Sequence, residues 1–248
     1  MESRQLKMCT KILSKLWDSS MKEETIIISL GGSLIVPENI DTDFLRDFKK
    51  LILSHVAQGK KFVIITGGGR TCRKYQNVAK EITSVSKEDL DWIGIATNNL
   101  NAELLRVIFG EKAHTKVIID LSKQFSLDKP IVIGGALEPG HSSDFDAVLA
   151  AKTVSAKKII NLSNTDYVYD SDPKKNPDAK KIEKISWAEY RKIIPDEWIH
   201  AGLNSPFDPI ASKMAEEEGM EVVIMNGKPI DNFAKCLNGE KFLGTIIS

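Results

Sequence analysis

The sequence has few cysteines, no long apolar run and no excess of charge of either sign. Its three cysteines are an odd number without a CxxC pair, which argues against a disulfide framework and a zinc site and suits a reducing compartment. No stretch approaches the ~18 consecutive apolar residues that a membrane span requires. Lys+Arg and Asp+Glu are both 34, so no global basic field indicates a nucleic-acid partner. We therefore expect a cytoplasmic protein with neither a membrane nor a nucleic acid as its partner.

The first 24 residues differ from the rest of the chain. They lack the continuous apolar core of a signal peptide, and Leu6, Leu13 and Trp17 recur at helical spacing with lysines between them. We expect residues 1–24 to form an N-terminal amphipathic extension. Three roles stay open for it: docking on the body or on a neighbouring subunit, a frayed end, or contact with a membrane surface.

From Thr25 onward, short β-branched runs alternate with longer amphipathic stretches. The expected strands are residues 25–30, 62–66, 116–119, 131–133, 158–161, 221–225 and 242–247. The expected helices are residues 43–57, 71–82, 90–109, 145–154, 187–194, 209–218 and 230–237. This alternation predicts an α/β fold with a mainly parallel central sheet sandwiched between helices. Ligands bind such folds at the carboxyl ends of the strands.

Three of the expected strands run into glycine-rich loops. The first loop contains Gly31, Gly32 and Ser33, and the second is Gly67-Gly68-Gly69, directly before a helix that carries Arg70 and Arg73. A helix N-terminus offers free N–H groups and the positive end of the helix dipole, and two arginines three residues apart can grip a phosphate there. The alternative for this loop is a tight turn with two surface arginines.

The third loop joins Gly134-Gly135 to Ser142-Ser143-Asp144 at the next helix entry. Helix capping accounts for one of these three polar residues. The sequence has neither a GxxxxGK[ST] motif nor a GxGxxG motif after a strand. Three separate glycine loops therefore favour a site that holds two phosphorylated molecules facing each other.

Several longer segments carry a family resemblance. They are LGGSLIVPENIDTDF at 30–44, TGGGRTCRKYQNVA at 66–79, DWIGIATNNLNAELL at 91–105, GGALEPGHSSD at 134–144, NTDYVYDSDP at 164–173, PFDPIASK at 206–213, and residues 238–246. In this order they resemble the amino-acid-kinase superfamily, and most closely its UMP kinase branch of the archaeal type. The resemblance runs from about Ile26 to the C-terminus.

The resemblance implies transfer of the γ-phosphoryl group of ATP to UMP, giving UDP and ADP in pyrimidine nucleotide biosynthesis, with Mg²⁺ as cofactor. It implies a homohexamer and one domain, 25–248, with an acceptor-binding lobe at about 25–154 and an ATP-binding lobe at about 155–248. The UMP-binding residues would be Gly67, Gly68, Arg73, Asp91, Ser142 and Ser143. The ATP-binding residues would be Gly31, Gly32, Ser33, Gly134, Gly135, Asn164, Asp166, Tyr169 and Asp172. The catalytic residues would be Arg70, Asp144 and Asp208, and no metal ligand is assigned.

The chain also departs from the family pattern. Ser29 stands where many members have the lysine that reaches the transferred phosphoryl group, so Arg70 is our candidate for the missing cation. Asn99 replaces a common arginine and Tyr167 replaces a glycine beside the expected adenine pocket. Phe145 and Asp146 replace small apolar residues. These changes could alter the nucleotide preference or mark a distinct subgroup.

Two other functions stay open. One is a kinase for another acceptor such as isopentenyl phosphate, an amino-acid carboxylate or carbamate. An isopentenyl phosphate kinase would want a histidine shortly after the triple glycine, where this chain has residues 70–73 (RTCR). Carboxylate acceptors would not call for two arginines at one helix start. The other function is a catalytically silent nucleotide- or oxyanion-binding protein on the same fold.

Overall fold

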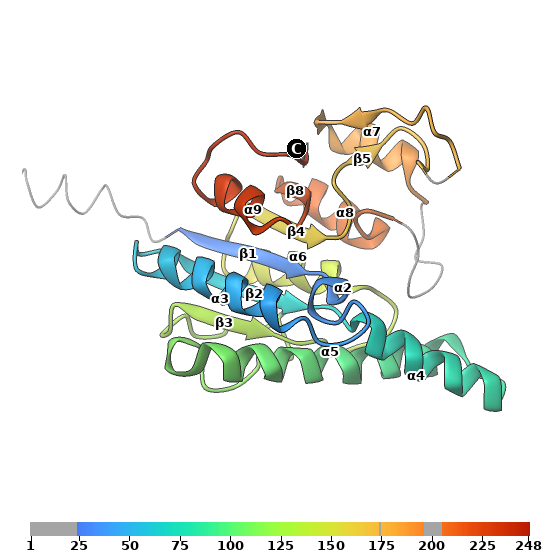
Figure 1. Ribbon diagram of the computed structural model, residues 1–248, viewed down its shortest axis with the longest axis horizontal. Coiled ribbons are helices and arrows are strands. Elements are labelled where there is room, and N and C mark those ends of the chain that lie inside the picture. Colours follow the sequence, from blue (N-terminus) through green and yellow to red (C-terminus); the bar gives the residue numbers. More distant parts are fainter. Residues whose placement is uncertain (1–23, 174, 196–204) are drawn as a thin grey trace, which may run out of the picture.

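The computed structural model describes residues 24–173, 175–195 and 205–248, so the expected extension lies outside the described residues except for Glu24. A seven-stranded sheet in the order β3-β2-β1-β4-β8-β9-β7 forms the centre (Figure 1). Parallel pairing joins β3 (Ile131–Gly134), β2 (Lys61–Thr66), β1 (Thr25–Leu30), β4 (Lys158–Ser163) and β8 (Glu221–Asn226). The strand β9 (Thr245–Ile247) is antiparallel to β8 and parallel to β7 (Lys184–Ile185). The expected α/β fold with a mainly parallel sheet is confirmed.

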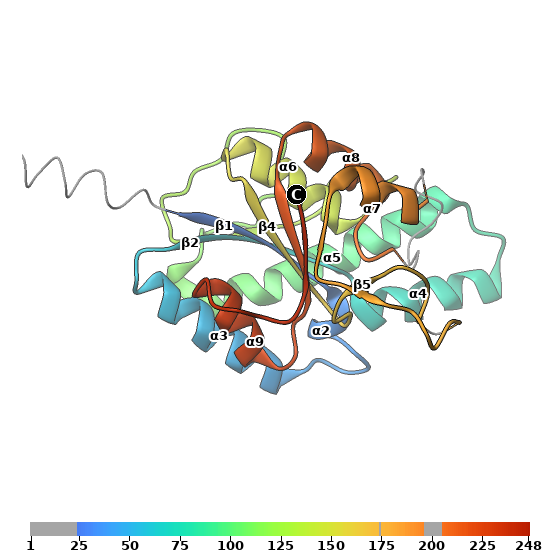
Figure 2. The ribbon, with the colours of Figure 1, turned by 90° about the horizontal axis from the view of Figure 1, so that it is seen from above.

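Helices cover both faces of this sheet, as Figure 2 shows from above. On one face lie α3 (Thr42–Val56), α5 (Lys87–Phe109) and α9 (Ile230–Leu237), and on the other lie α6 (Ser143–Thr153), α7 (Trp187–Ile193) and α8 (Pro209–Glu217). Successive side chains of a strand point to opposite faces. Accordingly, Ile26 and Ile28 belong to the first core and Ile27 to the second, all of them buried. The nearly continuous apolar strands of the sequence follow from this two-sided burial.

Most of the expected elements are found within a few residues of their expected bounds, but the strand expected at 116–119 is wrong. Only an isolated bridge between Ile118 and Gly134 forms there. The backbone N–H of Lys116 donates to His114 Nδ1 instead (3.3 Å), and such local side-chain bonds compete with a sheet ladder. The structure adds the short helix α2 (Gly32–Ile35), the strand β7, and the hairpin β5 (Val168–Tyr169) and β6 (Lys181–Ile182).

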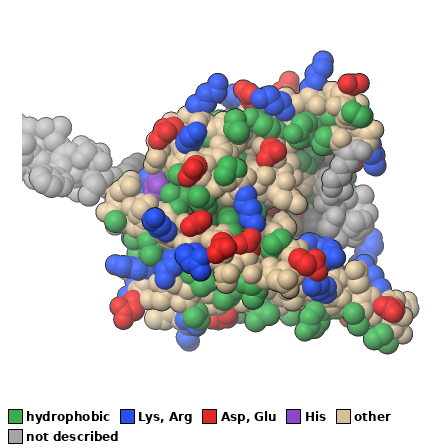
Figure 3. Space-filling view, in the orientation of Figure 1, with side chains coloured by type: hydrophobic (Ala, Val, Ile, Leu, Met, Phe, Trp, Pro, Cys, Tyr) green, Lys and Arg blue, Asp and Glu red, His purple; other side chains and the backbone are tan. Residues whose placement is uncertain are grey.

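The N-terminal and C-terminal halves of the chain share one continuous sheet, because β1 pairs directly with β4. The helices α4 (Gly69–Ile82) and α5 lie side by side and extend beyond the sheet at the carboxyl ends of its strands (Figures 1 and 2). Positive and negative side chains are interspersed over the face seen in Figure 3. Within the described ranges, none of the helices has the length and apolar composition of a membrane-spanning segment.

Candidate functional site

The loops after β1 and β2 meet backbone against backbone. A Cβ added to Gly32 would lie 2.1 Å from the Gly69 nitrogen, and Gly69 itself has a φ of +64°. Glycine is therefore the residue that fits without strain at each of these two positions. The N–H of Arg70 donates to the Val36 carbonyl (2.9 Å). The N-cap of α4, Gly68, makes no side-chain capping bond, so the other N–H groups of the first turn can meet an anion.

Two cavities open at this contact. The first, which we call the α4–α5 cavity, has a volume of about 380 Å³ and lies between these two helices and the loop after β3. The second, the β1–β4 cavity, has a volume of about 280 Å³ and lies over the ends of β1 and β4. The two cavities share five lining residues: Gly68, Gly69, Arg73, Ser142 and Ser143. A ligand in one cavity can therefore face a ligand in the other across these residues.

The structure brings many of the expected site residues to these cavities. The α4–α5 cavity is lined by all six residues expected to bind the acceptor: Gly67, Gly68, Arg73, Asp91, Ser142 and Ser143. The β1–β4 cavity is lined by five residues of the expected ATP and catalytic sets: Gly31, Gly32, Ser33, Asp144 and Asp208. The remaining expected residues line neither cavity: Arg70, Gly134, Gly135, Asn164, Asp166, Tyr169 and Asp172.

Asp144 is held in place by donors from three different elements. Its Oδ1 accepts hydrogen bonds from Ser29 Oγ (2.8 Å) and Asn161 Nδ2 (2.7 Å), and its Oδ2 accepts one from the backbone N–H of Asp208 (3.2 Å). Burial raises the pKa of the Asp144 carboxyl to about 7, the Ser29 hydrogen bond opposes this rise, and the negative charge of Asp208 adds to it. Ser29, which stands in place of a lysine, thus orients a carboxyl group.

Asp208 connects two loops of the β1–β4 cavity. Its Oδ1 caps α8 by accepting from the N–H groups of Ile210 (2.7 Å) and Ala211 (3.0 Å). Its Oδ2 accepts from the N–H of Ser142 (3.0 Å), and the residue is only 2% exposed. This carboxylate accordingly fixes Ser142 against the start of α8.

The two arginines of α4 have different surroundings. Arg73 lines both cavities and is the fifth residue of α4, near the N-terminal end, where a cation is unfavourable unless an anion joins it. Arg70 lies outside both cavities, and its Nε is 3.1 Å from Glu38 Oε2. Glu38 Oε1 also pairs with Lys74 Nζ (2.9 Å). Among the described residues, Arg73 is the one arginine or lysine on the lining of the β1–β4 cavity.

The hydrogen bonds that hold the loop after β3 were not expected from the sequence. Asn99 holds this loop, since its Nδ2 donates to the Ala136 carbonyl (3.1 Å) and its Oδ1 accepts from the Ala136 N–H (2.9 Å). Further along the loop, the N–H of Gly140 donates to Asp91 Oδ2 (2.9 Å). The common arginine at position 99 is thus replaced by an amide that positions the wall of the α4–α5 cavity.

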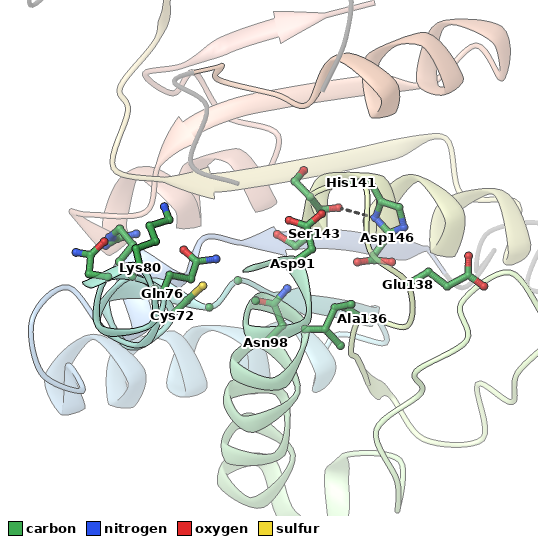
Figure 4. Close-up of a pocket in the computed structure, with 18 residues that line it drawn as sticks. Cys72, Gln76, Lys80, Asp91, Asn98, Ala136, Glu138, His141, Ser143 and Asp146 are labelled. Atoms are coloured by element: carbon green, nitrogen blue, oxygen red, sulfur yellow. Dashed lines mark hydrogen bonds between the residues drawn. The ribbon is translucent and has the colours of Figure 1, made fainter. Parts of the chain in front are cut away.

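The α4–α5 cavity has several further lining residues that the sequence reasoning missed: Cys72, Gln76, Asn77, Lys80, Asn98, Glu138, His141 and Asp146 (Figure 4). Positions 69, 73, 76 and 80 recur at helical spacing and share one face of α4. That periodicity could have identified Gln76 and Lys80. Nothing comparable marked the loop residues.

Four other residues expected to bind ATP follow β4: Asn164 and Asp166 lie in the loop before β5, Tyr169 ends β5, and Asp172 lies between β5 and β6. Asn164, Asp166 and Asp172 are exposed, and Asp166 Oδ1 accepts from Asn226 Nδ2 (2.9 Å). Tyr167 is buried, with Lys181 Nζ 4.8 Å from its ring centroid. The bulky side chain at this position thus packs beneath the β5–β6 hairpin.

Within the parts of the chain that the structure describes, no group of three or more His, Cys, Asp or Glu side chains could hold a metal ion. The oxygens of Asp144 and Asp208 already accept hydrogen bonds from the protein. These residues therefore fit Mg²⁺ only as an ion that arrives bound to substrate phosphates, which is its usual mode in kinases.

Comparison with known proteins agrees with this geometry. The family model described as "Amino acid kinase family" matches residues 24–226. Uridylate kinase of Thermococcus kodakarensis is 34% identical over 224 residues, which cover 90% of this chain and 98% of that protein. Uridylate kinase of Methanobrevibacter smithii is 32% identical over 225 residues, which cover 90% of this chain and 99% of that protein.

The crystal structure of uridylate kinase from Archaeoglobus fulgidus superposes with a TM-score of 0.75 at 33% identity, covering 90% of this chain and 99% of that one. UMP kinase from Bacillus anthracis has a TM-score of 0.72 at 21% identity, covers 91% of this chain and 96% of that one, and shows the same fold. The chain therefore belongs to the amino acid kinase family, in the branch that contains the archaeal uridylate kinases.

Proposed function

We propose that this chain is a cytoplasmic kinase that transfers the γ-phosphoryl group of ATP to UMP. The observation that carries the proposal is the pair of cavities with five shared lining residues. Phosphoryl transfer requires donor and acceptor phosphates in line and neutralisation of their negative charge. The relatives named above are uridylate kinases, which favours UMP as the acceptor.

In this proposal the α4–α5 cavity holds UMP. Arg73 and the N–H groups of the first turn of α4 other than that of Arg70 bind its phosphate, and Asp91 accepts hydrogen bonds from the ribose hydroxyls. The attacking phosphate oxygen is already ionised, so it needs no general base. Residues 25–154 contribute this acceptor lobe.

The β1–β4 cavity holds the ATP phosphates against Gly31, Gly32 and Ser33. Asp144 and Asp208 keep the walls of this cavity in position, Asp144 through Ser29 and Asn161 and Asp208 through Ser142. The nucleoside part of ATP extends toward the segment between β4 and β6, which contains Asn164, Asp166, Tyr169 and Asp172. Mg²⁺ bound to ATP supplies charge neutralisation at the phosphates.

A coupled assay of ADP release tests the function and its rivals. We expect ADP release with UMP and much less with CMP, isopentenyl phosphate or glutamate derivatives. Rapid turnover of isopentenyl phosphate but not UMP would reassign the acceptor. Nucleotide binding without ADP release from any acceptor would indicate a catalytically silent relative.

We also propose that the protein is a homohexamer. Trp92, Leu100 and Val107 of α5 are 47%, 61% and 65% exposed. At 100° per residue they fall on one side of the helix, where exposed apolar side chains favour a subunit contact. We expect light scattering at micromolar concentration to give six times the chain mass of 27.6 kDa. A monomer under these conditions would contradict the assembly but not the activity.

A further inference from the structure

Asp146 lies on the first turn of α6 and has an unusual environment for a carboxylate. The residue is only 4% exposed, lines the α4–α5 cavity, and belongs to none of the residues that line the β1–β4 cavity. No group of the described residues donates a hydrogen bond to its Oδ2. In Figure 4 it lies toward His141 and Glu138 and away from Lys80, Gln76 and Cys72.

By itself, the burial of this oxygen without a donor destabilises the folded protein. A buried polar group without a hydrogen-bond partner keeps its full desolvation penalty, and a buried unpaired charge costs more. The contrast with Asp144, two residues earlier, is direct, since three donors hold that carboxyl. Two residues along a helix rotate a side chain by about 200°, so Asp146 faces away from the donors that satisfy Asp144.

The cavity itself indicates which part of a ligand meets Asp146. The phosphate of the acceptor nucleotide lies at the residues that line both cavities, beside Arg73. A carboxylate in contact with that phosphate would be repelled by it. Asp146 lines the α4–α5 cavity and is absent from the lining of the β1–β4 cavity, so we place it against the nucleoside of the acceptor rather than against the phosphates. The donors of a pyrimidine nucleoside are base N–H groups and ribose hydroxyls, and Asp91 is already assigned to the hydroxyls.

We propose that Asp146 is a specificity-determining residue whose carboxyl accepts a hydrogen bond from an N–H group on the base of the acceptor nucleotide. For UMP the donor is the ring N3–H of uracil. The inference rests on the proposed function and extends it, because it names the group that distinguishes a pyrimidine acceptor with an N–H donor from one without it. Ligand binding supplies the hydrogen bond that the folded protein lacks.

The test compares UMP with 3-methyluridine 5′-monophosphate, in which a methyl group replaces the N3 hydrogen. We expect the wild-type protein to prefer UMP in kcat/KM by more than tenfold. Asp146→Ala should narrow that preference at least tenfold, since only UMP then loses the buried acceptor of its N3–H group. Asp146→Asn retains an accepting carbonyl oxygen and should keep an intermediate preference. An unchanged ratio in Asp146→Ala would overturn the proposal.

Two further measurements separate the alternatives. Arg73→Ala is the matched control. It weakens binding of the 5′-phosphate, which UMP and its 3-methyl analogue have in common, so kcat/KM should fall for both nucleotides while their ratio stays unchanged. A contact with the ribose would instead reduce the preference for UMP over dUMP in Asp146→Ala, and that result would overturn the assignment to the base. If the wild-type protein itself releases no ADP with UMP, the proposed function fails and this inference fails with it.

A stability measurement detects a merely structural role. Removal of an unpaired buried carboxyl should leave Tm unchanged or raise it in Asp146→Ala, whereas a residue that holds the fold together would lower Tm when truncated. A marked fall in Tm together with an unchanged nucleotide ratio would assign Asp146 to the scaffold.

Discussion

The two cavities differ in how their carboxylates are satisfied. In the β1–β4 cavity, Asp144 and Asp208 accept hydrogen bonds from residues that are far apart in the sequence. In the α4–α5 cavity, none of the described residues donates a hydrogen bond to Asp146 Oδ2, and Arg73 lines the cavity near the N-terminal end of α4. The protein therefore organises the phosphate-transfer side by itself and relies on the acceptor to complete the other side. Pre-organised polar groups favour catalysis, while unsatisfied groups favour selectivity, since an imperfect ligand leaves them unpaired.

The largest expected effect comes from the organised side. Asp208→Ala removes the cap of α8 and the bond to Ser142 together. If each loss costs about 1.5–3 kcal/mol, as for bonds to charged groups, kcat should fall by about 100-fold or more. Tm should fall as well, because a helix cap is lost.

Steady-state kinetics and thermal unfolding measure both effects. The control is Asp178→Ala, which removes an exposed carboxylate outside both cavities and should leave both kcat and Tm unchanged. Wild-type kcat in the Asp208 variant would show that the two cavities do not depend on its bonds.

The next effect concerns the incomplete side. Arg73→Ala should raise the KM for UMP about 10- to 100-fold, because a charge-assisted contact to one phosphate is lost. The KM for ATP should change much less, even though Arg73 also reaches the wall of the second cavity. Equal losses for both substrates would show that Arg73 serves the donor phosphates as much as the acceptor.

Asp91→Asn should act on the sugar rather than on the phosphate. An amide oxygen accepts a hydroxyl hydrogen bond less strongly than a carboxylate, so the preference for UMP over dUMP should narrow by roughly tenfold. Competition kinetics with UMP and dUMP measure this preference as a ratio of kcat/KM values. Because Asp91 Oδ2 also accepts from the N–H of Gly140 (2.9 Å), a loss shared equally by UMP and dUMP would indicate that Asp91 positions the loop instead.

The unpaired carboxyl should also make stability depend on pH. Burial raises the pKa of Asp146 to about 8, and the charges of Asp144 and Asp208 add to this rise, whereas the unfolded chain has a value near ~4. Between these values the folded state binds more protons, so the free energy of unfolding falls as pH increases from about 4 to 8. One such group contributes at most ~1.4 kcal/mol per pH unit.

Chemical denaturation of the wild-type protein and of Asp146→Asn between pH 5 and pH 8 measures this dependence. The difference between the two proteins cancels the contributions of the histidines, and it should grow in favour of Asp146→Asn as pH rises. A difference that is constant across this window would show that Asp146 has no raised pKa.

Local patterns in the sequence predicted the sheet and its covering helices, and the family resemblance supplied the six residues of the acceptor set. Buried strands are continuous apolar runs, and glycines before a helix mark a phosphate loop. Pairings between distant residues left no such pattern. Ser29 with Asp144, or Asn99 with Ala136, could be identified only once the strands and loops were placed in space. A local pattern can also mislead. The segment 116–119 (KVII) is rich in β-branched residues but forms only an isolated bridge at Ile118 and no strand.

The smallest expected effect distinguishes the two arginines of α4. The sequence assigns Arg70 as the cation that replaces the missing lysine, and this role stays a prediction. Its side chain is 46% exposed and paired with Glu38, and such surface ion pairs contribute no more than about 1 kcal/mol. The pair therefore opens readily, so Arg70 can leave Glu38 when ATP binds.

If Arg70 stabilises the transition state, Arg70→Ala should lower kcat by up to about tenfold with little change in the KM for UMP or for ATP. Such a result indicates an interaction that forms only in the transition state. Glu38→Gln, which releases Arg70, should then leave kcat unchanged or raise it slightly. Lys74→Ala is the matched control, because Lys74 shares Glu38 but lies farther along the helix. If Arg70→Ala and Lys74→Ala behave alike and kcat stays within twofold of wild type, Arg70 belongs to the surface pair alone. Arg73 then supplies the protein's positive charge between the two cavities.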